Sequence, residues 1–356
     1  MLPHKTHAPA LRDHRERVSC DSHDLSILDL SPVPAGSSSA DALRNTIDLA
    51  RHADALGLAR YWLAEHHNAA GIASSSPEIM IAAVAAATSR IRVGSGGIML
   101  PNHSALKVAE TFRALHALHP GRIDLGVGRA AGTDNRTALA LRRSKEHLGA
   151  DRFPEQLAEL VGLLTHDPDP AVKFGPLKAV PTGVPAPELH LLGASAESAA
   201  YAAEHGFGFA YAHHFAPDGA AAALTRYRAE FRASALRATP HAIVAVAVVC
   251  GETDAHAEEL ASSGDLAWSR FGQGLRDLPL PSVAEARTYV FDADEEKLRR
   301  LGRGRSVVGG PENVGRVLRA LVAESGADEV MVTATIHDHA ERKRSYDRIL
   351  SALARD

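Results

Sequence analysis

Two stretches in the first third of the chain decide the fold: Tyr61-Trp62-Leu63-Ala64-Glu65-His66-His67 and Val93-Gly94-Ser95-Gly96-Gly97-Ile98-Met99-Leu100-Pro101. Each has the pattern of a buried β-strand that ends in polar or glycine-rich residues, and a helix-forming segment follows each one. A strand, a polar tip and a helix form the repeating unit of a (β/α) barrel, where catalytic groups gather at the carboxyl ends of the strands. We therefore expect functional residues directly after these two strands.

The same alternation continues along the chain. Eight β-rich runs are expected, at residues 25–30, 60–63, 91–94, 123–127, 189–192, 207–211, 242–250 and 329–333. Helical patterns are expected at residues 40–56, 77–89, 104–118, 153–164, 195–204, 218–235, 254–269, 311–324 and 340–353. Continuous apolar strands separated by helices are typical of a parallel sheet buried on both faces. The pattern predicts an α/β protein with a closed TIM barrel, (β/α)8, rather than an open doubly wound sheet.

Two intervals are too long for simple connections. Residues 165–187 are rich in proline, and residues 270–306 mix glycine, proline and charged residues. Long excursions of this kind are typical of functional lids or mobile segments, and we expect both to be insertions in the barrel. No internal repeat or linker is evident, so residues 23–356 are expected to form a single domain. Residues 1–22 are polar and lack the apolar core of a signal peptide, which favours a disordered extension.

Composition excludes several classes of function. The chain has 356 residues, 45% of them hydrophobic, and a formal net charge of −4 without a cluster of Lys and Arg, so a nucleic-acid partner is not expected. No apolar run approaches the length of a membrane span. The two cysteines, Cys20 and Cys250, cannot form a disulfide framework. These features predict a cytoplasmic protein.

The run Glu65-His66-His67 stands immediately after an apolar strand. At a strand end two adjacent histidines can flank a pocket, where a neutral imidazole can move a proton near neutral pH. A structural histidine pair fits the pattern equally well. A metal site is a further reading, but the first strand lacks the His-x-His of metal-dependent barrel hydrolases, and no metal is expected.

Two glycine-containing segments follow or interrupt strands. Gly94-Ser95-Gly96-Gly97 fits either a close approach of the backbone to a flat ligand or a bulge at a barrel corner. Gly126-Val127-Gly128-Arg129 superficially resembles a dinucleotide fingerprint, but the spacing to the next glycine is wrong for a Rossmann motif. Arg129 at this strand end is either a phosphate ligand or a surface arginine.

A third candidate segment is Leu191-Leu192-Gly193-Ala194-Ser195-Ala196-Glu197-Ser198, which is a strand that leads into a helix. Ser195 and Ser198 lie three residues apart, so both hydroxyls can face the free amides of the first turn. A helix N-terminus with hydroxyls is suited to binding an anion, although an ordinary helix cap gives the same pattern. The small residues Gly193 and Ala194 leave room for a phosphate.

Together these motifs resemble the luciferase-like flavin-dependent monooxygenases, in particular their single-subunit bacterial members. The resemblance extends from Leu25 to the C-terminus. The matching segments, in chain order, are Leu28-Asp29-Leu30-Ser31-Pro32-Val33, Glu65-His66-His67, Gly94 to Pro101, Gly121-Arg122-Ile123-Asp124-Leu125-Gly126-Val127-Gly128-Arg129, Ser195 to Ser198, His213-His214-Phe215-Ala216-Pro217 and Gly326-Ala327-Asp328-Glu329-Val330-Met331-Val332-Thr333.

The resemblance implies a barrel that binds reduced FMN with the flavin ring at its mouth. Gly96-Gly97 matches the family's non-proline cis peptide beneath the ring, and His66 matches a catalytic histidine beside it. The positions that match the phosphate site are Arg129, Arg152, Gly193, Ala194, Ser195 and Ser198. Luciferase has a cysteine where this chain has Gly128 and a glutamate where it has Ala194, so light emission is not expected.

The implied activity is that of a monooxygenase. Reduced FMN, delivered by a separate flavin reductase or generated in place from NAD(P)H, would react with O₂ to give a flavin hydroperoxide that oxidises a small organic substrate. The alternatives are an F420-dependent oxidoreductase of the same fold, a non-catalytic flavin-binding protein and a metal hydrolase. Residues 77–89 carry more apolar surface than one barrel face needs, which predicts a homodimer.

Overall fold

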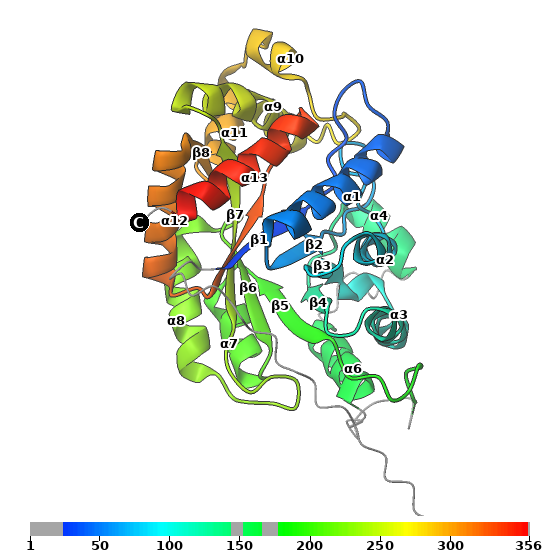
Figure 1. The fold of residues 1–356 in the computed structure, drawn as a ribbon. Helices are drawn as coiled ribbons and strands as arrows, with labels where there is room; N and C mark the ends of the chain where they lie inside the picture. The colour runs from blue at the N-terminus through cyan, green and yellow to red at the C-terminus, as the bar shows by residue number, and fades with distance from the viewer. Residues whose placement is uncertain (1–23, 144–151, 166–176, 355–356) are drawn as a thin grey trace, which may run out of the picture.

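The computed structural model describes residues 24–143, 152–165 and 177–354, which form a closed (β/α) barrel (Figure 1). Its ring of parallel strands runs β1-β2-β3-β4-β5-β6-β7-β9, and it closes because β7 pairs with both β6 and β9 while β9 pairs with β1. The ring strands are β1 (Asp24–Asp29), β2 (Arg60–Leu63), β3 (Arg92–Met99), β4 (Ile123–Gly128), β5 (Glu188–Gly193), β6 (Gly208–Ala212), β7 (Ala242–Cys250) and β9 (Glu329–Thr333). The TIM barrel expected from the sequence is confirmed.

A ninth strand was not expected from the sequence. The strand β8 (Ser306–Gly309) pairs with the carboxyl-terminal half of β7, from Ala247 to Cys250, and does not belong to the ring. Strand β3 is also longer than expected, because it continues through Gly96-Gly97 to Met99 instead of ending at Gly94.

Helices cover the outside of the barrel. They are α1 (Ser39–Leu56), α2 (Pro77–Ala87), η1 (Leu100–Asn102), α3 (Ala105–Leu118), α4 (Asn135–Arg142), α6 (Phe153–Thr165), α7 (Ala196–Glu204), η2 (Pro217–Gly219), α8 (Ala220–Glu230), α9 (Asp254–Gly272), α10 (Val283–Thr288), α11 (Ala293–Arg303), α12 (Pro311–Ser325) and α13 (His339–Leu353). The short helices α4, α10 and α11 were not expected. Within the part of the chain that the structure describes, every helix is too short or too polar to cross a membrane.

The two expected insertions have different outcomes. The interval 270–306 contains α10 and α11, which lie with α9 at the top of Figure 1, so it is an ordered helical excursion rather than an irregular loop. The interval 165–187 and the expected N-terminal extension 1–22 lie wholly or partly outside the described residues.

Several helix ends are fixed by local chemistry. Pro77 and Pro311 stand in the first turns of α2 and α12, as their sequences predict. The side chain of Arg122 donates to the Thr88 carbonyl at the end of α2 (2.9 Å), and that of Arg113 donates to the Leu164 carbonyl at the end of α6 (2.8 Å). These guanidinium groups satisfy carbonyls that the helices leave without partners.

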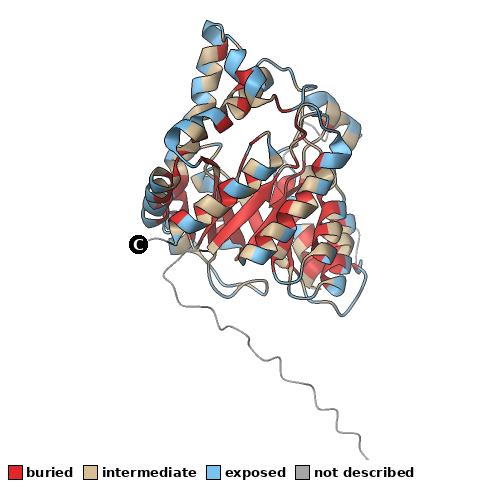
Figure 2. Cartoon of the chain, turned by 45° about the horizontal axis from the view of Figure 1, so that its top comes forward, coloured by how far each residue is buried: buried red, intermediate tan, exposed pale blue. Residues whose placement is uncertain are grey.

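The core has two apolar layers. The larger one lies between the ring and the helices, and the buried strands appear red in Figure 2 beneath helices with exposed outer faces. The smaller one fills the barrel interior with Leu28, Trp62, Ala64, Ala210, Ile243, Ala245 and Met331. The interior is therefore packed, and a ligand has room only at an end of the barrel.

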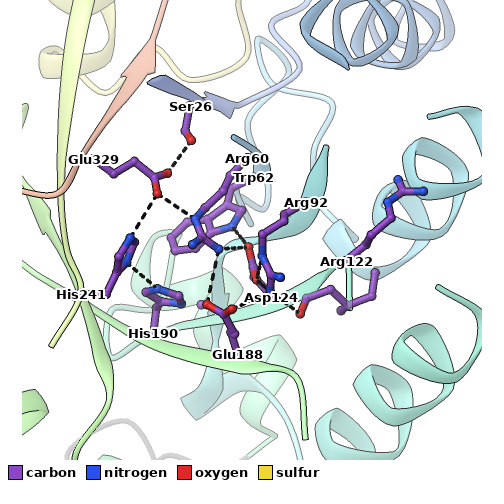
Figure 3. Close-up of polar contacts among 12 residues, drawn as sticks. Ser26, Arg60, Trp62, Arg92, Arg122, Asp124, Glu188, His190, His241 and Glu329 are labelled. Carbon is purple, nitrogen blue, oxygen red and sulfur yellow. Dashed lines mark hydrogen bonds and ion pairs between the residues drawn. The ribbon is translucent and has the colours of Figure 1, made fainter. Parts of the chain in front are cut away.

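The amino-terminal ends of the strands form a polar floor beneath this interior layer (Figure 3). Arg60 is almost completely buried, and its guanidinium contacts Asp124 (2.8 Å), Glu329 (2.9 Å) and Glu188 (3.6 Å). Buried charges are tolerated when they are paired in this way. The floor closes one end of the barrel, which leaves the carboxyl ends of the strands as the open mouth.

The acids of the floor also have partners other than Arg60. Asp124 accepts from Arg92 and from the Trp62 indole (3.0 Å). Glu329 accepts from the Ser26 hydroxyl and lies 3.5 Å from the His241 ring. Burial raises the pKa of Glu329, whereas the two arginines hold the pKa of Asp124 far below its usual range despite its burial.

Candidate active site

The predicted site residues lie at the mouth of the barrel. His66 follows β2, Gly96 and Gly97 lie in β3, and Arg129 follows β4 directly. Residues 193–195 form the end of β5 and the cap of α7. The fold thus brings four neighbouring strand ends together, as a barrel active site requires.

Strand β3 has an irregularity at the predicted glycine pair. The Gly96–Gly97 peptide bond is cis, and the register between β3 and β4 shifts between Ser95 and Ile98. The Ser95 hydroxyl bridges the irregularity, since it donates to the Gly126 carbonyl (2.8 Å) and accepts from the Gly126 amide (3.0 Å). A bulge and an unusual glycine peptide are therefore one feature of β3.

The barrel itself requires glycine at these positions. A Cβ atom on Gly96 would lie 2.6 Å from Leu28 Cδ1, and one on Gly97 would lie 2.9 Å from the Gly126 carbonyl oxygen. Side chains there would have to displace the interior layer or β4. Close packing of the interior layer and β4 around the buried Gly96 and Gly97 thus explains why both positions are glycine.

His66 is half-buried, and it carries the imidazole predicted to act in catalysis. Burial lowers the pKa of His66, although a ring hydrogen bond to the Gly132 carbonyl and the nearby Glu65 charge oppose this. The ring is therefore neutral near pH 7. Because one ring nitrogen donates to Gly132, the other has a lone pair that can accept a proton.

His214 faces the same mouth from β6. Its Nδ1 donates to the Ala245 carbonyl (2.9 Å). Burial lowers the pKa of the His214 ring, and the nearby His213 and His66 lower it further. The neighbouring His213 is partly buried, and among the described residues its Nδ1 has no hydrogen-bond partner. Two strands on opposite sides of the ring thus supply neutral imidazoles.

The start of α7 is a complete capping box. The Ser195 hydroxyl accepts from the Ser198 amide and the Ser198 hydroxyl accepts from the Ser195 amide, both at 3.3 Å. The Ser198 hydroxyl also fills the space that a side chain at Gly193 would need. Both hydroxyls therefore serve the helix, and they remain exposed beside its first-turn amides.

A carboxylate competes for the same helix end. Hydrogen bonds from its own backbone amide and from the Ser195 hydroxyl lower the pKa of Glu197. An anion that binds at the start of α7 must therefore share or replace these contacts.

The two predicted arginines stand on different elements. Arg129 is exposed, and because Val127 pairs with Leu191 the end of β4 lies beside the end of β5. Arg152 is exposed directly before α6, which packs mainly on α3 and η1. The strand register groups Arg129 with Ser195, whereas Arg152 belongs to the segment before α6.

Comparison with known proteins identifies the family. The model of the luciferase-like monooxygenase family matches residues 24–329. A protein named luciferase-like monooxygenase from Escherichia coli (strain K12) is 41% identical over 326 residues, which cover 91% of this chain and 95% of that protein. The chain belongs to the luciferase-like monooxygenase family.

One relative is named for its substrate, and one solved structure is similar over nearly the whole chain. The N-acetyl-S-alkylcysteine monooxygenase of Bacillus subtilis (strain 168) is 33% identical over 332 residues, 92% of this chain and 98% of that protein. Among solved structures, apo-MsnO8 has a TM-score of 0.81 and 38% sequence identity, over 93% of this chain and 98% of that one.

More distant structures share the fold with different cofactors. The oxygenating constituent of 3,6-diketocamphane monooxygenase from Pseudomonas putida, in complex with FMN, has a TM-score of 0.70 at 21% identity over 94% of this chain and 98% of that chain. An F420-dependent secondary alcohol dehydrogenase has a TM-score of 0.66 at 12% identity, over 94% of this chain and 100% of that chain. The same fold therefore occurs in a protein that binds FMN and in one that is F420-dependent.

Three residues of the mouth, Glu65, His103 and His214, were given no role in the site from the sequence. Glu65 is completely buried and accepts hydrogen bonds from His67 and His103, and His214 lies close enough to His66 for their charges to interact. A signal was present, because Glu65 and His214 each follow a predicted strand closely and His103 stands directly before a predicted helix. Within residues 24–143, 152–165 and 177–354, no three His, Cys, Asp or Glu side chains are grouped to hold a metal ion.

Proposed function

We propose that this protein is a flavin-dependent monooxygenase that uses reduced FMN and O₂ to oxidise a small organic substrate. The observation that carries the proposal is the neutral, half-buried His66 at the end of β2, next to strand β3, where packing leaves room only for glycine at positions 96 and 97. The FMN-bound structural neighbour and the monooxygenase relatives support the same cofactor and reaction class.

The donors around the ends of β4 and β5 suit a phosphate chemically. We infer that Arg129 and Arg152 supply charge, and that the Ser195 and Ser198 hydroxyls supply hydrogen bonds at the start of α7. Gly193 and Ala194 leave the approach to this helix free of large side chains. Glu197 would then turn away towards solvent, which its exposed position allows.

Reduced FMN supplies the electrons that activate O₂ when it is bound. The protein would hold the flavin phosphate, orient the ring over the β3 backbone and exclude water from the mouth. His66 would accept or return a proton at the ring nitrogen that does not bond to Gly132. Electrons would come indirectly from NAD(P)H, by way of a separate flavin reductase.

Binding experiments separate the cofactors. Anaerobic titration of the purified protein with reduced FMN should show saturable binding, and parallel titrations with F420 should show much weaker binding. Tight binding of F420 and weak binding of FMN would instead favour the deazaflavin oxidoreductase. Binding of FMN without oxidation of any substrate on reduction and aeration would indicate a non-catalytic flavin protein.

We also propose that the protein is a homodimer with α2 in its interface. Met80, Ile81 and Val84 of this helix are buried in the barrel, but Ile79 is 65% exposed and Ala86 is also exposed. An apolar outer stripe of this kind is typical of a partner surface. Light scattering at micromolar concentration should give the mass of a dimer, and the mass of a monomer would contradict this proposal.

A further inference from the structure

Glu65 collects three hydrogen bonds at the barrel mouth, although its side chain is fully buried. Its Oε1 atom lies 2.9 Å from Nε2 of His67 and 2.9 Å from Nε2 of His103. Its Oε2 atom accepts from the Met99 amide at 2.9 Å. One carboxylate therefore joins the loop after β2 to the end of β3 and to the residue that follows η1.

The loop after β4 packs against the same point. Gly132 has a φ of +64°, and a Cβ atom there would lie 2.7 Å from the Glu65 carbonyl oxygen. The His67 amide donates to the Gly132 carbonyl (3.3 Å), and the Thr133 hydroxyl donates to the His67 carbonyl (3.0 Å). Three consecutive mouth loops thus meet around Glu65.

The hydrogen bonds of this cluster change the pKa values of Glu65 and His103. Burial alone would raise the pKa of Glu65, but hydrogen bonds from His103 and His67 outweigh it and lower the pKa to about 2. Burial opposes the charge on His103 as well, yet the bond to Glu65, with the Glu78 charge on α2, raises the pKa of that ring. The titratable groups around Glu65 and His103 are thus His66 and His67 on the loop after β2, and Glu78 on α2.

We propose that Glu65 is a positioning residue for the reaction at this mouth, where it orients His67 and His103, holds His103 as a proton donor and ties together the loops that flank the β3 glycines. This inference rests on the proposed flavin oxygenation, because it names the residue that would make the His103 imidazole easier to protonate beside that site. Each ring uses Nε2 to bind Glu65, so Nδ1 of His103 is left to act on other groups. Buried carboxylates fix histidine tautomers in the same manner at metal sites and in catalytic triads.

The first test is a histidine titration by NMR on the cofactor-free, full-length protein. His103→Gln identifies the His103 signal, and Glu65→Gln removes the charge while keeping the size of the side chain. Loss of an opposite charge in contact should lower the His103 midpoint by at least about 1 pH unit. Asp347→Asn is the matched control, since it removes a carboxylate from His52 (2.6 Å) on the outer helices and should leave His103 unchanged.

The second test is the pH profile of oxygen coupling in the FMN-loaded enzyme. If His103 acts while protonated, coupling falls as the pH rises through its midpoint, and in Glu65→Gln that fall should move to lower pH by the same amount. In His103→Gln, Glu65 keeps its other two hydrogen-bond donors, so this variant should fold. Its coupling should no longer fall as the pH rises through the His103 midpoint.

A His103 midpoint that is unchanged in Glu65→Gln would overturn the proposal, and so would a shifted midpoint with an unshifted coupling profile. The titration needs no flavin. Failure of the wild-type protein to bind reduced FMN would count against the proposed function alone, and the His103 midpoint would still decide whether Glu65 controls that ring.

Discussion

The substitution Arg60→Met tests the reading of the barrel floor. It keeps an unbranched side chain of similar length but removes the guanidinium that contacts Asp124 and Glu329. Asp124 keeps Arg92 and Trp62 as partners, so its charge remains compensated. Glu329 keeps the Ser26 hydroxyl and the His241 ring, which is neutral near pH 7 because burial lowers its pKa. The variant therefore leaves the buried Glu329 carboxylate without a positively charged partner.

Breaking a buried ion pair by removing one partner costs about 3–5 kcal/mol. Because the free energy of unfolding of a domain is about 5–15 kcal/mol, this loss is a large part of the total. Burial already raises the pKa of Glu329, so the stranded group takes up a proton more readily in the folded state than in the unfolded state. Stability from such a proton is lost as pH rises, and the deficit of Arg60→Met should be larger at pH 8 than at pH 5.

Urea unfolding followed by circular dichroism measures the effect. Glu329→Gln in the Arg60→Met background removes the stranded charge and should recover about 1–3 kcal/mol. Arg226→Met is the control, because its pair with Glu230 is exposed and surface ion pairs of this kind contribute little to stability. Arg60→Met within about 1 kcal/mol of wild type, or a double variant less stable than the single one, would refute the assignment of the floor as a compensated charge network.

Three further predictions concern the site and the pH dependence. His66→Ala should leave the affinity for FMN nearly unchanged but release more hydrogen peroxide per O₂ consumed, because proton handling is lost; unchanged coupled turnover would remove His66 from the mechanism. Arg129→Ala should weaken FMN binding by about 1.5–3 kcal/mol in a fluorescence titration, as expected for a lost charged hydrogen bond, and native affinity would contradict its phosphate role. Burial lowers the folded-state pKa of His241 and, more strongly, of His190, so the unfolded state binds more protons and stability should fall as pH decreases from about 6.5 towards 4. That slope should be smaller in His241→Gln, and an equal slope would show that His241 is not buried as a neutral ring.

The barrel could be predicted from the sequence because its ring strands are continuous apolar runs between amphipathic helices. β3 was predicted too short, since Gly-Ser-Gly-Gly has low strand propensity. Pairing with β2 and β4, together with the Ser95 hydroxyl, keeps this segment in the sheet. β8 was missed because it has four residues and pairs with only half of β7. Both errors arise where tertiary pairing overrides local preference.

The sequence predicted where the site residues stand along the chain, but only some of the contacts between them. Strand ends locate His66 and Arg129, but the partners of Glu65 come from different loops, such as His103, which is 38 residues away. The floor is more remote still, since Arg60 and Glu329 are separated by 269 residues. Long-range charge pairing leaves no local pattern, so these networks become evident only in the folded barrel.

The most direct test of the central claim is to mix the protein, loaded anaerobically with reduced FMN, with aerated buffer in a stopped-flow spectrometer. A monooxygenase site that shields the flavin predicts that the bound flavin regains its oxidised absorbance more slowly than free reduced FMN, and in more than one phase. Reoxidation in a single phase at the rate of free FMN would contradict the claim that this barrel mouth is a flavin oxygenation site.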